Sequence, residues 1–352
     1  MSSPIYPVIT DTHMKVDNIS LVTDIFRQFI DLTKSLGLKK CFHMGDFFTS
    51  RASQTLECLT EAGEILDMFE NERITLYIFP GNHDKVSLID EKSYLSVICK
   101  RRKYVKLIES ETMILDTENK LKIFVLPYFK EGMEYLSRLS NLIEQNDDEV
   151  EYKKVLLTHT SINGVMNNDG SVVEGDIDQD FFQIFDLVLS GHYHNRSFLT
   201  KKIIYIGSGY QSNYGEDEDK GFAIINDDLS LEFVQSKFPI YRKFVIDISD
   251  EEKAQKMLKE HSDKGNNIRF EFVGDQEQID NFDANKYNSA GISVKYKNII
   301  DRGVLFTEVE DASMISFDKK TVLKHFIMYA NQQQYDKKQM KRGMELINEI
   351  QF

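Results

Sequence analysis

The sequence predicts an α/β fold built on a largely parallel sheet. Its first 80 residues alternate short apolar segments with amphipathic ones, in the order strand, helix, strand, helix, strand. This order is the βαβ pattern of a parallel sheet. The apolar segments end in polar residues, and ligands of open α/β folds bind at the carboxyl ends of strands. A chain of 352 residues, 41% of them hydrophobic, suggests two domains or one large domain with an appendage.

Each element of this region rests on its own apolar pattern. Residues 18–36 carry apolar side chains at helical spacing, and Gly37 follows them as a helix C-cap. The last strand of the series runs into Pro80-Gly81, which are ordinary turn residues. The expected elements are strands at 7–10, 40–44 and 74–79 and helices at 18–36 and 56–69.

The middle of the chain is expected to be more antiparallel. Residues 113–115 and 122–126 flank Glu118-Asn119, as two strands flank the turn of a hairpin. The other elements expected here are a helix at 132–143 and strands at 155–159, 186–190, 203–206 and 222–225.

The pattern changes near Pro239. The elements expected beyond it are strands at 243–247, 268–273 and 291–296 and helices at 250–261 and 276–282. They predict a small α+β domain. Residues 319–352 have helical periodicity with a break near 334–335. The sequence therefore predicts three parts, at 1–238, 239–315 and 316–352.

Charge and cysteine content limit the function classes. The net charge is −14, whereas a protein that binds nucleic acid through its overall charge is basic, so any phosphate contact must be local or supplied by a partner. Cys41, Cys58 and Cys99 form no C-x-x-C pair and are expected to be buried thiols of a reducing compartment. The sequence shows neither a secretory signal nor an apolar run of ~20 residues, which predicts a soluble cytoplasmic protein.

Polar residues suited to metal binding follow five of the expected strands. A lone histidine near a strand end is more often a hydrogen-bonded core residue, but five of the eight histidines lie in these segments. Imidazole, carboxylate and amide donors without a thiolate suit Mn²⁺, Fe²⁺ or Zn²⁺. In an extended chain, residues two apart point to the same face and converge on one ion. The segments are Asp11-Thr12-His13, Gly45-Asp46, Gly81-Asn82-His83-Asp84, Thr158-His159 and Gly191-His192-Tyr193-His194.

These five motifs, in this order, resemble those of the calcineurin-like metallophosphoesterases. The resemblance covers about the first two-thirds of the chain. It implies a β-sandwich flanked by helices, in four layers αββα, with a smaller α+β capping domain and C-terminal helices. It also implies two divalent metal ions, with Mn²⁺ favoured over the alternatives Mg²⁺ and Fe²⁺. The reaction it implies is hydrolysis of phosphodiester bonds by a two-metal mechanism.

The resemblance assigns a role to each residue of the motifs. His83 would be the catalytic histidine above the phosphate, and Asp84 would orient His83 or, as we favour, brace the loop. Asp46 would bridge the two ions. One ion would be held by Asp11, His13, Asp46 and His194, and the other by Asp46, Asn82, His159 and His192.

Three further segments are similar to those of the SbcD nuclease family: 45–53, Tyr205–Phe222 and Tyr241–Val245. They imply a Mn²⁺-dependent DNA exonuclease and endonuclease subunit of a repair or phage recombination complex, in the host cytoplasm if phage-encoded. Its partners would be DNA and an SMC-like coiled-coil ATPase of the SbcC type, and a homodimer is compatible with the sequence. Residues 319–352 would dock on that ATPase, although a helical hairpin packed on its own domain fits almost as well.

The chain departs from this family at Thr49, where Asp or His is usual, at Ser53, which lacks a preceding proline, and at 14–16. Its densest basic cluster, Lys100, Arg101, Arg102 and Lys103, could contact DNA, but such a run is more often a solvated surface. The acidic loop Glu216–Asp219 would face away from DNA or be a plain solvated turn. Two other functions fit the same fold: a small-molecule phosphodiesterase or phosphatase, and a non-catalytic scaffold.

Overall fold

The structure is a computed structural model, and it describes residues 2–298 apart from 89–90, 131, 147–150, 167–170, 175–176, 262–265, 284–286 and 288–291. The chain divides into two compact units, Met1–Tyr241 and Arg242–Phe352. The predicted C-terminal helical segment, 316–352, lies outside the described residues. Within the described part, no helix is both long and apolar enough to cross a membrane.

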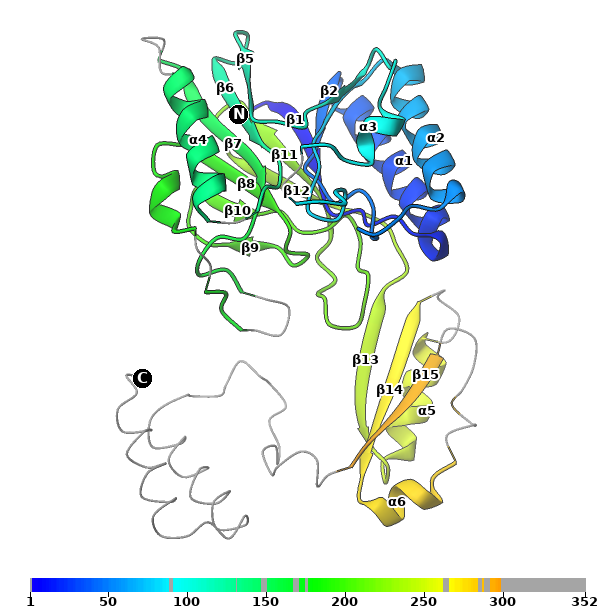
Figure 1. Ribbon diagram of the computed structural model, residues 1–352. Helices are drawn as coiled ribbons and strands as arrows, with labels where there is room; N and C mark the ends of the chain where they lie inside the picture. The colour runs from blue at the N-terminus through cyan, green and yellow to red at the C-terminus, as the bar shows by residue number, and fades with distance from the viewer. Residues whose placement is uncertain are drawn as a thin grey trace, which may run out of the picture. The chain divides into compact units, whose positions relative to one another are not determined.

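The first unit contains two six-stranded sheets (Figure 1). In the first sheet, the neighbouring strands β1, β2, β3 and β4 are parallel, and β11 pairs antiparallel with β1. The order of this sheet is β12 (Leu231–Gln235), β11 (Gly221–Asn226), β1 (Pro4–Ile9), β2 (Lys40–His43), β3 (Thr75–Ile78) and β4 (Val105–Leu107).

The second sheet corrects the prediction of an antiparallel middle. The hairpin around Glu118-Asn119 exists, because β5 and β6 pair antiparallel, but β6, β7, β8 and β10 are all parallel. A helix between β6 and β7 carries the chain back to the starting edge, as a parallel pair requires. The order of this sheet is β5 (Thr112–Asp116), β6 (Leu121–Leu126), β7 (Lys153–His159), β8 (Leu187–Gly191), β10 (Ile203–Tyr205) and β9 (Ser197–Phe198).

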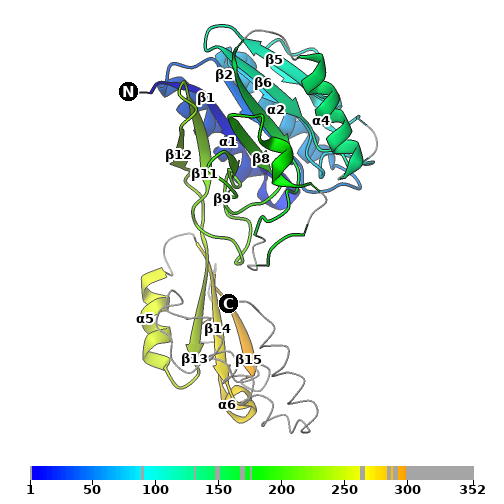
Figure 2. The same cartoon turned by 90° about the vertical axis from the view of Figure 1, so that its left-hand side faces the viewer.

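The predicted four-layer αββα arrangement is confirmed. Apolar side chains of both sheets, among them Val8 and Leu157, form the core between them. The outer face of the first sheet packs on α1 (Ile19–Ser35) and α2 (Leu56–Glu72), and that of the second on α4 (Met133–Gln145). Figure 1 shows α1 and α2 on the opposite side of the sheets from α4, and Figure 2 shows the strands from the α4 side. The short helices are η1 (Val16–Asn18), α3 (Leu95–Ile98) and η2 (Gln179–Phe182).

Local sequence signals set the limits of the main helices. Gly37, with φ at +70°, follows the last turn of α1 in the left-handed conformation that a glycine C-cap adopts. The hydroxyl of Thr55 accepts the backbone N–H of Cys58 at 3.3 Å and caps the start of α2. All three cysteines are buried and form no disulfide, so they pack as small apolar side chains.

The second unit, as far as it is described, is a three-stranded sheet with two helices. Its sheet order is β13-β14-β15, and β14 and β15 are parallel. Phe270, Phe272 and Tyr287 lie in its buried core. The elements match the expected α+β pattern: β13 (Tyr241–Asp247), α5 (Glu251–His261), β14 (Asn267–Gly274), α6 (Gln276–Asn281) and β15 (Ile292–Asn298).

Candidate metal centre

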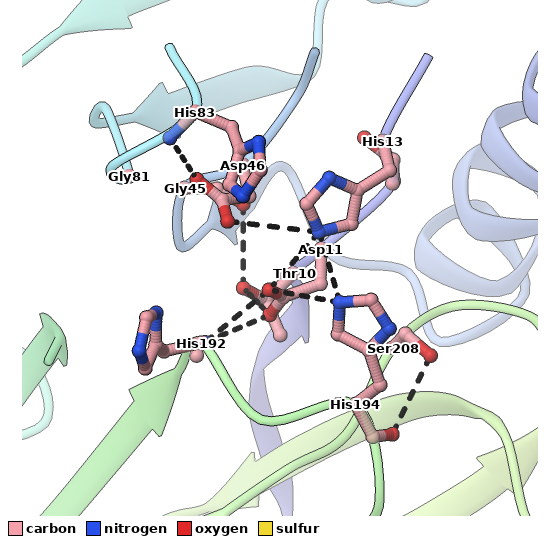
Figure 3. Close-up of polar contacts among 12 residues, drawn as sticks. Thr10, Asp11, His13, Gly45, Asp46, Gly81, His83, His192, His194 and Ser208 are labelled. Atoms are coloured by element: carbon pink, nitrogen blue, oxygen red, sulfur yellow. Dashed lines mark hydrogen bonds and ion pairs between the residues drawn. The ribbon is translucent and has the colours of Figure 1, made fainter. Parts of the chain in front are cut away.

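The loops that follow β1, β2, β3 and β8 meet the end of β7, and together they bring the seven predicted ligands close to one another. Two groups can each direct three ligand atoms to within 4.8 Å of one another: Asp11, His13 and His194, and Asp46, His159 and His192. Figure 3 shows His13 and His194 on one side of the two carboxylates and His192 on the other. The parallel strands of each sheet end at a common edge, and contacts such as that of His159 with the carbonyl of Met44 join the edges of the two sheets, so motifs far apart in sequence converge here.

Asp46 lies between the two groups. Its Oδ2 atom is 3.6 Å from Nε2 of His13 and 3.3 Å from Nε2 of His159. Asn82 joins the second group, because its Oδ1 atom is 3.2 Å from Nε2 of His159 and 3.0 Å from Nδ1 of His192. Each group therefore has a set of imidazole and oxygen donors, and one carboxylate oxygen could serve both.

The expectation that the ligands alternate along an extended chain is wrong. Asp11, His13, Asp46 and His192 have φ values of 53°, 43°, 55° and 91°, in the left-handed region. Such conformations cost energy for residues other than glycine and persist only where the surroundings fix them. The ligands converge because the chain turns sharply after each strand, not because side chains alternate within it.

Hydrogen bonds fix these turns. The backbone N–H of Asp11 donates to the carbonyl of Gly45, and that of His13 to the carbonyl of Asp46, each at 3.0 Å. The side chain of Asn18 donates to the carbonyl of His13 at 3.0 Å, and the hydroxyl of Thr49 donates to the same carbonyl at 2.6 Å. The loops after β1 and β2 therefore hold each other in position.

Two glycines permit the ligand loops to approach one another closely. A Cβ atom at Gly81 would lie 2.2 Å from Oδ1 of Asp46, and a Cβ atom at Gly191 would lie 2.3 Å from Oγ1 of Thr10. Contacts this short do not occur between non-bonded atoms, so a larger side chain at either position would displace the ligand loops.

His83 is held by the loop after β2. Its Nδ1 atom donates to the backbone carbonyl of Thr49 at 2.6 Å, and its backbone N–H donates to Oδ1 of Asp46 at 2.8 Å. The ring of His83 packs edge-on against the ring of His13, with centroids 4.9 Å apart. Position 49 thus orients the histidine through its backbone, whatever its side chain is.

Asp84 braces the loop rather than contacting His83. It is fully buried, and its carboxylate accepts the backbone N–H groups of Gly81 at 2.9 Å, Phe48 at 3.0 Å and Phe47 at 3.2 Å. Burial and the charge of Asp46 raise the pKa of Asp84 to about 7, while the three N–H groups oppose that shift. The carboxylate ties the loop after β3 to the loop after β2.

The electrostatics of the centre are those of paired carboxylates and imidazoles. Burial disfavours the charged forms of Asp11 and Asp46, but the neighbouring imidazoles, His159 foremost, hold the pKa of both below its usual range. Burial lowers the pKa of His159, but the charges of Asp46 and Asp11 outweigh it and raise that pKa to about 9. For His192, burial and the charge of His159 lower the pKa to about 4. Bound cations would replace the protons that hold these pairs together.

Hydrogen bonds donated by Nδ1 orient two of the candidate ligand imidazoles. Nδ1 of His159 donates to the carbonyl of Met44 at 2.8 Å, and Nδ1 of His194 donates to Oε1 of Glu216 at 2.8 Å. Both contacts leave Nε2 as the atom that faces the group. Such outer partners are usual for histidines that bind metals, so the donor set and its supports fit two divalent ions.

Glu216 contacts a predicted ligand, His194, and the sequence did not reveal this contact. The acidic loop Glu216–Asp219 was expected to be solvated, and Asp217 and Asp219 are exposed, but Glu216 is only 6% exposed. Burial raises the pKa of Glu216, but the hydrogen bond from His194, with Ser212 and Lys220, lowers it to about 2. A run of four acidic residues carries no pattern that would distinguish the buried one.

The predicted basic cluster lies away from the ligands. Residues 100–103 precede β4, at the edge where the parallel strands begin, whereas the ligands follow the ends of β1, β2 and β3. Arg102 is engaged, since its guanidinium binds Asp67 at 2.9 Å and the carbonyls of Gly63 and Ile98. Lys100, Arg101 and Lys103 are exposed, which favours the interpretation as a solvated surface.

Comparison with known proteins agrees with this geometry. The family model for calcineurin-like phosphoesterase matches residues 8–196. "Putative phosphoesterase 244L" of Invertebrate iridescent virus 6 is 27% identical over 251 residues, covering 68% of this chain and 81% of the relative. "Exonuclease subunit 1" of Enterobacteria phage T4 is 25% identical over 232 residues, covering 62% of each chain.

Among solved structures, a dimetal phosphatase of Danio rerio is 10% identical, with a TM-score of 0.41, and the match covers 63% of this chain and 92% of that one. The family model spans more than half of the 352 residues and includes every predicted ligand. This chain therefore belongs to the calcineurin-like phosphoesterase family.

Proposed function

We propose that this protein is the nuclease subunit of a DNA recombination or repair complex, a Mn²⁺-dependent exonuclease and endonuclease. The observation that carries the proposal is the pair of ligand groups around Asp46, with His83 fixed beside them. The similarity to a phage protein named exonuclease subunit 1 supports DNA as the substrate. So do the Tyr205–Phe222 and Tyr241–Val245 segments, which resemble the SbcD nucleases.

The proposed ligands follow the two groups. Asp46 would be shared. When bound, two divalent ions would polarise the phosphodiester and the attacking water. Asp11, His13 and His194 would complete one site, and Asn82, His159 and His192 the other.

His83 would act on the leaving oxygen. In its imidazolium form, the ring would donate Nδ1–H to Thr49, at the observed 2.6 Å, and Nε2–H to the departing alkoxide. Proton transfer by a positioned group contributes typically about 10²–10⁴-fold to the rate. Asp84 would keep the loop that carries His83 in place and would not touch the substrate.

A partner would supply most of the DNA affinity. The net charge of −14 opposes binding to a polyanion, and the cluster at 100–103 lies at the far edge of the first sheet. We therefore propose that the chain acts in the cytoplasm with an SMC-like coiled-coil ATPase of the SbcC type, and that residues 316–352 dock on it. A homodimer of the chain is compatible with this assembly.

A DNA digestion assay with Mn²⁺, with and without the ATPase encoded by the same genome, tests the proposal. We expect cleavage of linear DNA that requires Mn²⁺ and increases when the ATPase is present. Asp46→Asn serves as the inactive control, since it removes the shared carboxylate. Absence of DNA cleavage under both conditions would contradict the nuclease assignment.

The second candidate is a small-molecule phosphodiesterase or phosphatase with the same centre. It is favoured by the net charge and by the viral relative, whose name specifies only a phosphoesterase. Efficient hydrolysis of a nucleotide phosphoester, without DNA cleavage even beside the ATPase, would select this function. A protein that binds no Mn²⁺ under replete conditions would instead be a scaffold.

A further inference from the structure

Behind His194 lies a buried acid–base pair formed by Glu216 and Lys220, which we call the Glu216–Lys220 clamp. Oε1 of Glu216 accepts Nδ1–H of His194 at 2.8 Å. Nζ of Lys220 donates to the backbone carbonyl of His194 at 2.5 Å and lies 3.6 Å from Oε2 of Glu216. One residue therefore fixes the ring of His194 and the other fixes its backbone.

The carboxylate of Glu216 is itself held in place. Oε1 also accepts the hydroxyl of Ser212 at 2.5 Å and the side-chain amide of Asn213 at 2.8 Å, while Oε2 accepts the backbone N–H of Ser212 at 3.0 Å. Glu216 is only 6% exposed and Lys220 is fully buried, so water has little access to the carboxylate and the ammonium group. A carboxylate with this many fixed donors cannot swing away from His194 without breaking several hydrogen bonds.

The two ligand groups differ in the acceptor to which a histidine of each group donates its Nδ1–H. His159, of the second group, donates to the neutral backbone carbonyl of Met44. His194, of the first group, donates to the charged carboxylate of Glu216. A carboxylate behind an imidazole fixes the ring tautomer and raises the basicity of the coordinating nitrogen, so the first group gains a support that His159 does not have.

We propose that Glu216 is a positioning residue for the ion held by Asp11, His13 and His194, and that it makes this site bind its ion more tightly. The proposal rests on the dimetal site proposed above. Glu216 would hold the proton of His194 on Nδ1 and so keep Nε2 as the ligand atom. Loss of such an outer partner typically weakens metal binding by about 10–100-fold.

Mn²⁺ titration by calorimetry on the full chain tests this, with wild type, Glu216→Gln and Asp219→Asn compared. Asp219 lies in the same loop and loses the same charge, but it is exposed and pairs with Arg196 rather than His194. We expect wild type and Asp219→Asn each to bind two ions. The affinity of each site should be the same in the two proteins. Glu216→Gln should bind one ion as wild type does and the other about 10–100-fold more weakly.

The outcomes separate the two proposals. If wild type fails to bind two ions, the dimetal function fails. If wild type binds two ions and Glu216→Gln binds both unchanged, or weakens both equally, only the role of Glu216 is overturned.

A second measurement needs no folded Glu216 variant. In wild-type protein labelled with ¹⁵N-histidine and loaded with Zn²⁺, which is diamagnetic, long-range ¹H–¹⁵N spectra report which nitrogen carries the proton. We expect the proton of His194 on Nδ1, with the signal assigned by its loss in His194→Gln. A proton on Nε2 would overturn the proposal.

Discussion

Nδ1 of His83 donates to the backbone carbonyl of Thr49 at 2.6 Å, so the chain itself orients the proposed catalytic histidine. In the resembling nucleases, Asp or His is usual at this position. In this chain, the side chain of Thr49 is directed to the carbonyl of His13 and takes no part in holding His83.

Thr49→Ala should therefore retain most of the cleavage activity, because the carbonyl that holds His83 remains. It should lower the free energy of unfolding by about 1 kcal/mol, since one side-chain hydrogen bond is lost. DNA digestion rates and urea unfolding measure the two effects. A rate as low as that of His83→Ala would show that the Thr49 side chain is needed in catalysis.

Gly81→Ala should remove metal binding at both sites. The added Cβ would lie 2.2 Å from Oδ1 of Asp46, and Asp46 is shared by the two groups. Calorimetry with Mn²⁺ checks this. Gly37→Ala is the control, because Gly37 has a φ of +70°, which strains alanine, but a Cβ there meets no atom within 4 Å. It should cost about 1 kcal/mol of stability and leave metal binding intact. Two bound ions in Gly81→Ala would contradict the close packing around Asp46.

Asp84→Asn should destabilise the protein by about 1–3 kcal/mol, because the amide replaces one acceptor oxygen with a donor that faces buried N–H groups. Urea unfolding measures the loss. Asp24→Asn removes an acid that is 61% exposed and pairs with Arg27, so it should change stability by less than about 1 kcal/mol. Equal effects of the two substitutions would argue against a bracing role for Asp84.

Much of the centre could be predicted from the sequence because polar residues follow parallel strands, whose ends share an edge of each sheet. Asp11, Asp46 and Asn82 lie at the edge of the first sheet, and His159 and His192 lie at that of the second. The left-handed backbone at the ligands could not be predicted from the sequence, since the Asp-x-His motif fits an extended chain equally well. The parallel pairing in the second sheet could not be predicted either, because the hairpin at Glu118-Asn119 does not determine how the later strands pair.

The position of Glu216 could not be predicted from the residues around it in the sequence. Its burial depends on contacts with His194 and Lys220, and the local composition of an acidic loop does not record these contacts. The carbonyls of Met44 and Thr49 orient histidines in the same way. A backbone carbonyl has no residue signature at all, so only the folded chain reveals these supports.

Mn²⁺ should stabilise the folded protein, because the ligands converge only in the native state. At a free metal concentration of 100 Kd, each site adds about 2.7 kcal/mol to the free energy of unfolding. Thermal unfolding with Mn²⁺ and with a chelator measures the difference. An unchanged midpoint would mean that the converged ligands do not bind the ion.

The proposed mechanism depends most on the separate roles of two adjacent residues, Asn82 as a ligand and His83 as the acid. Metal content and DNA cleavage, measured together on Asn82→Ala and His83→Ala, test it most directly. We expect Asn82→Ala to lose affinity for Mn²⁺, and His83→Ala to bind two ions and cleave about 10²–10⁴-fold more slowly. Loss of metal from His83→Ala, or full metal binding by Asn82→Ala, would contradict the assignment.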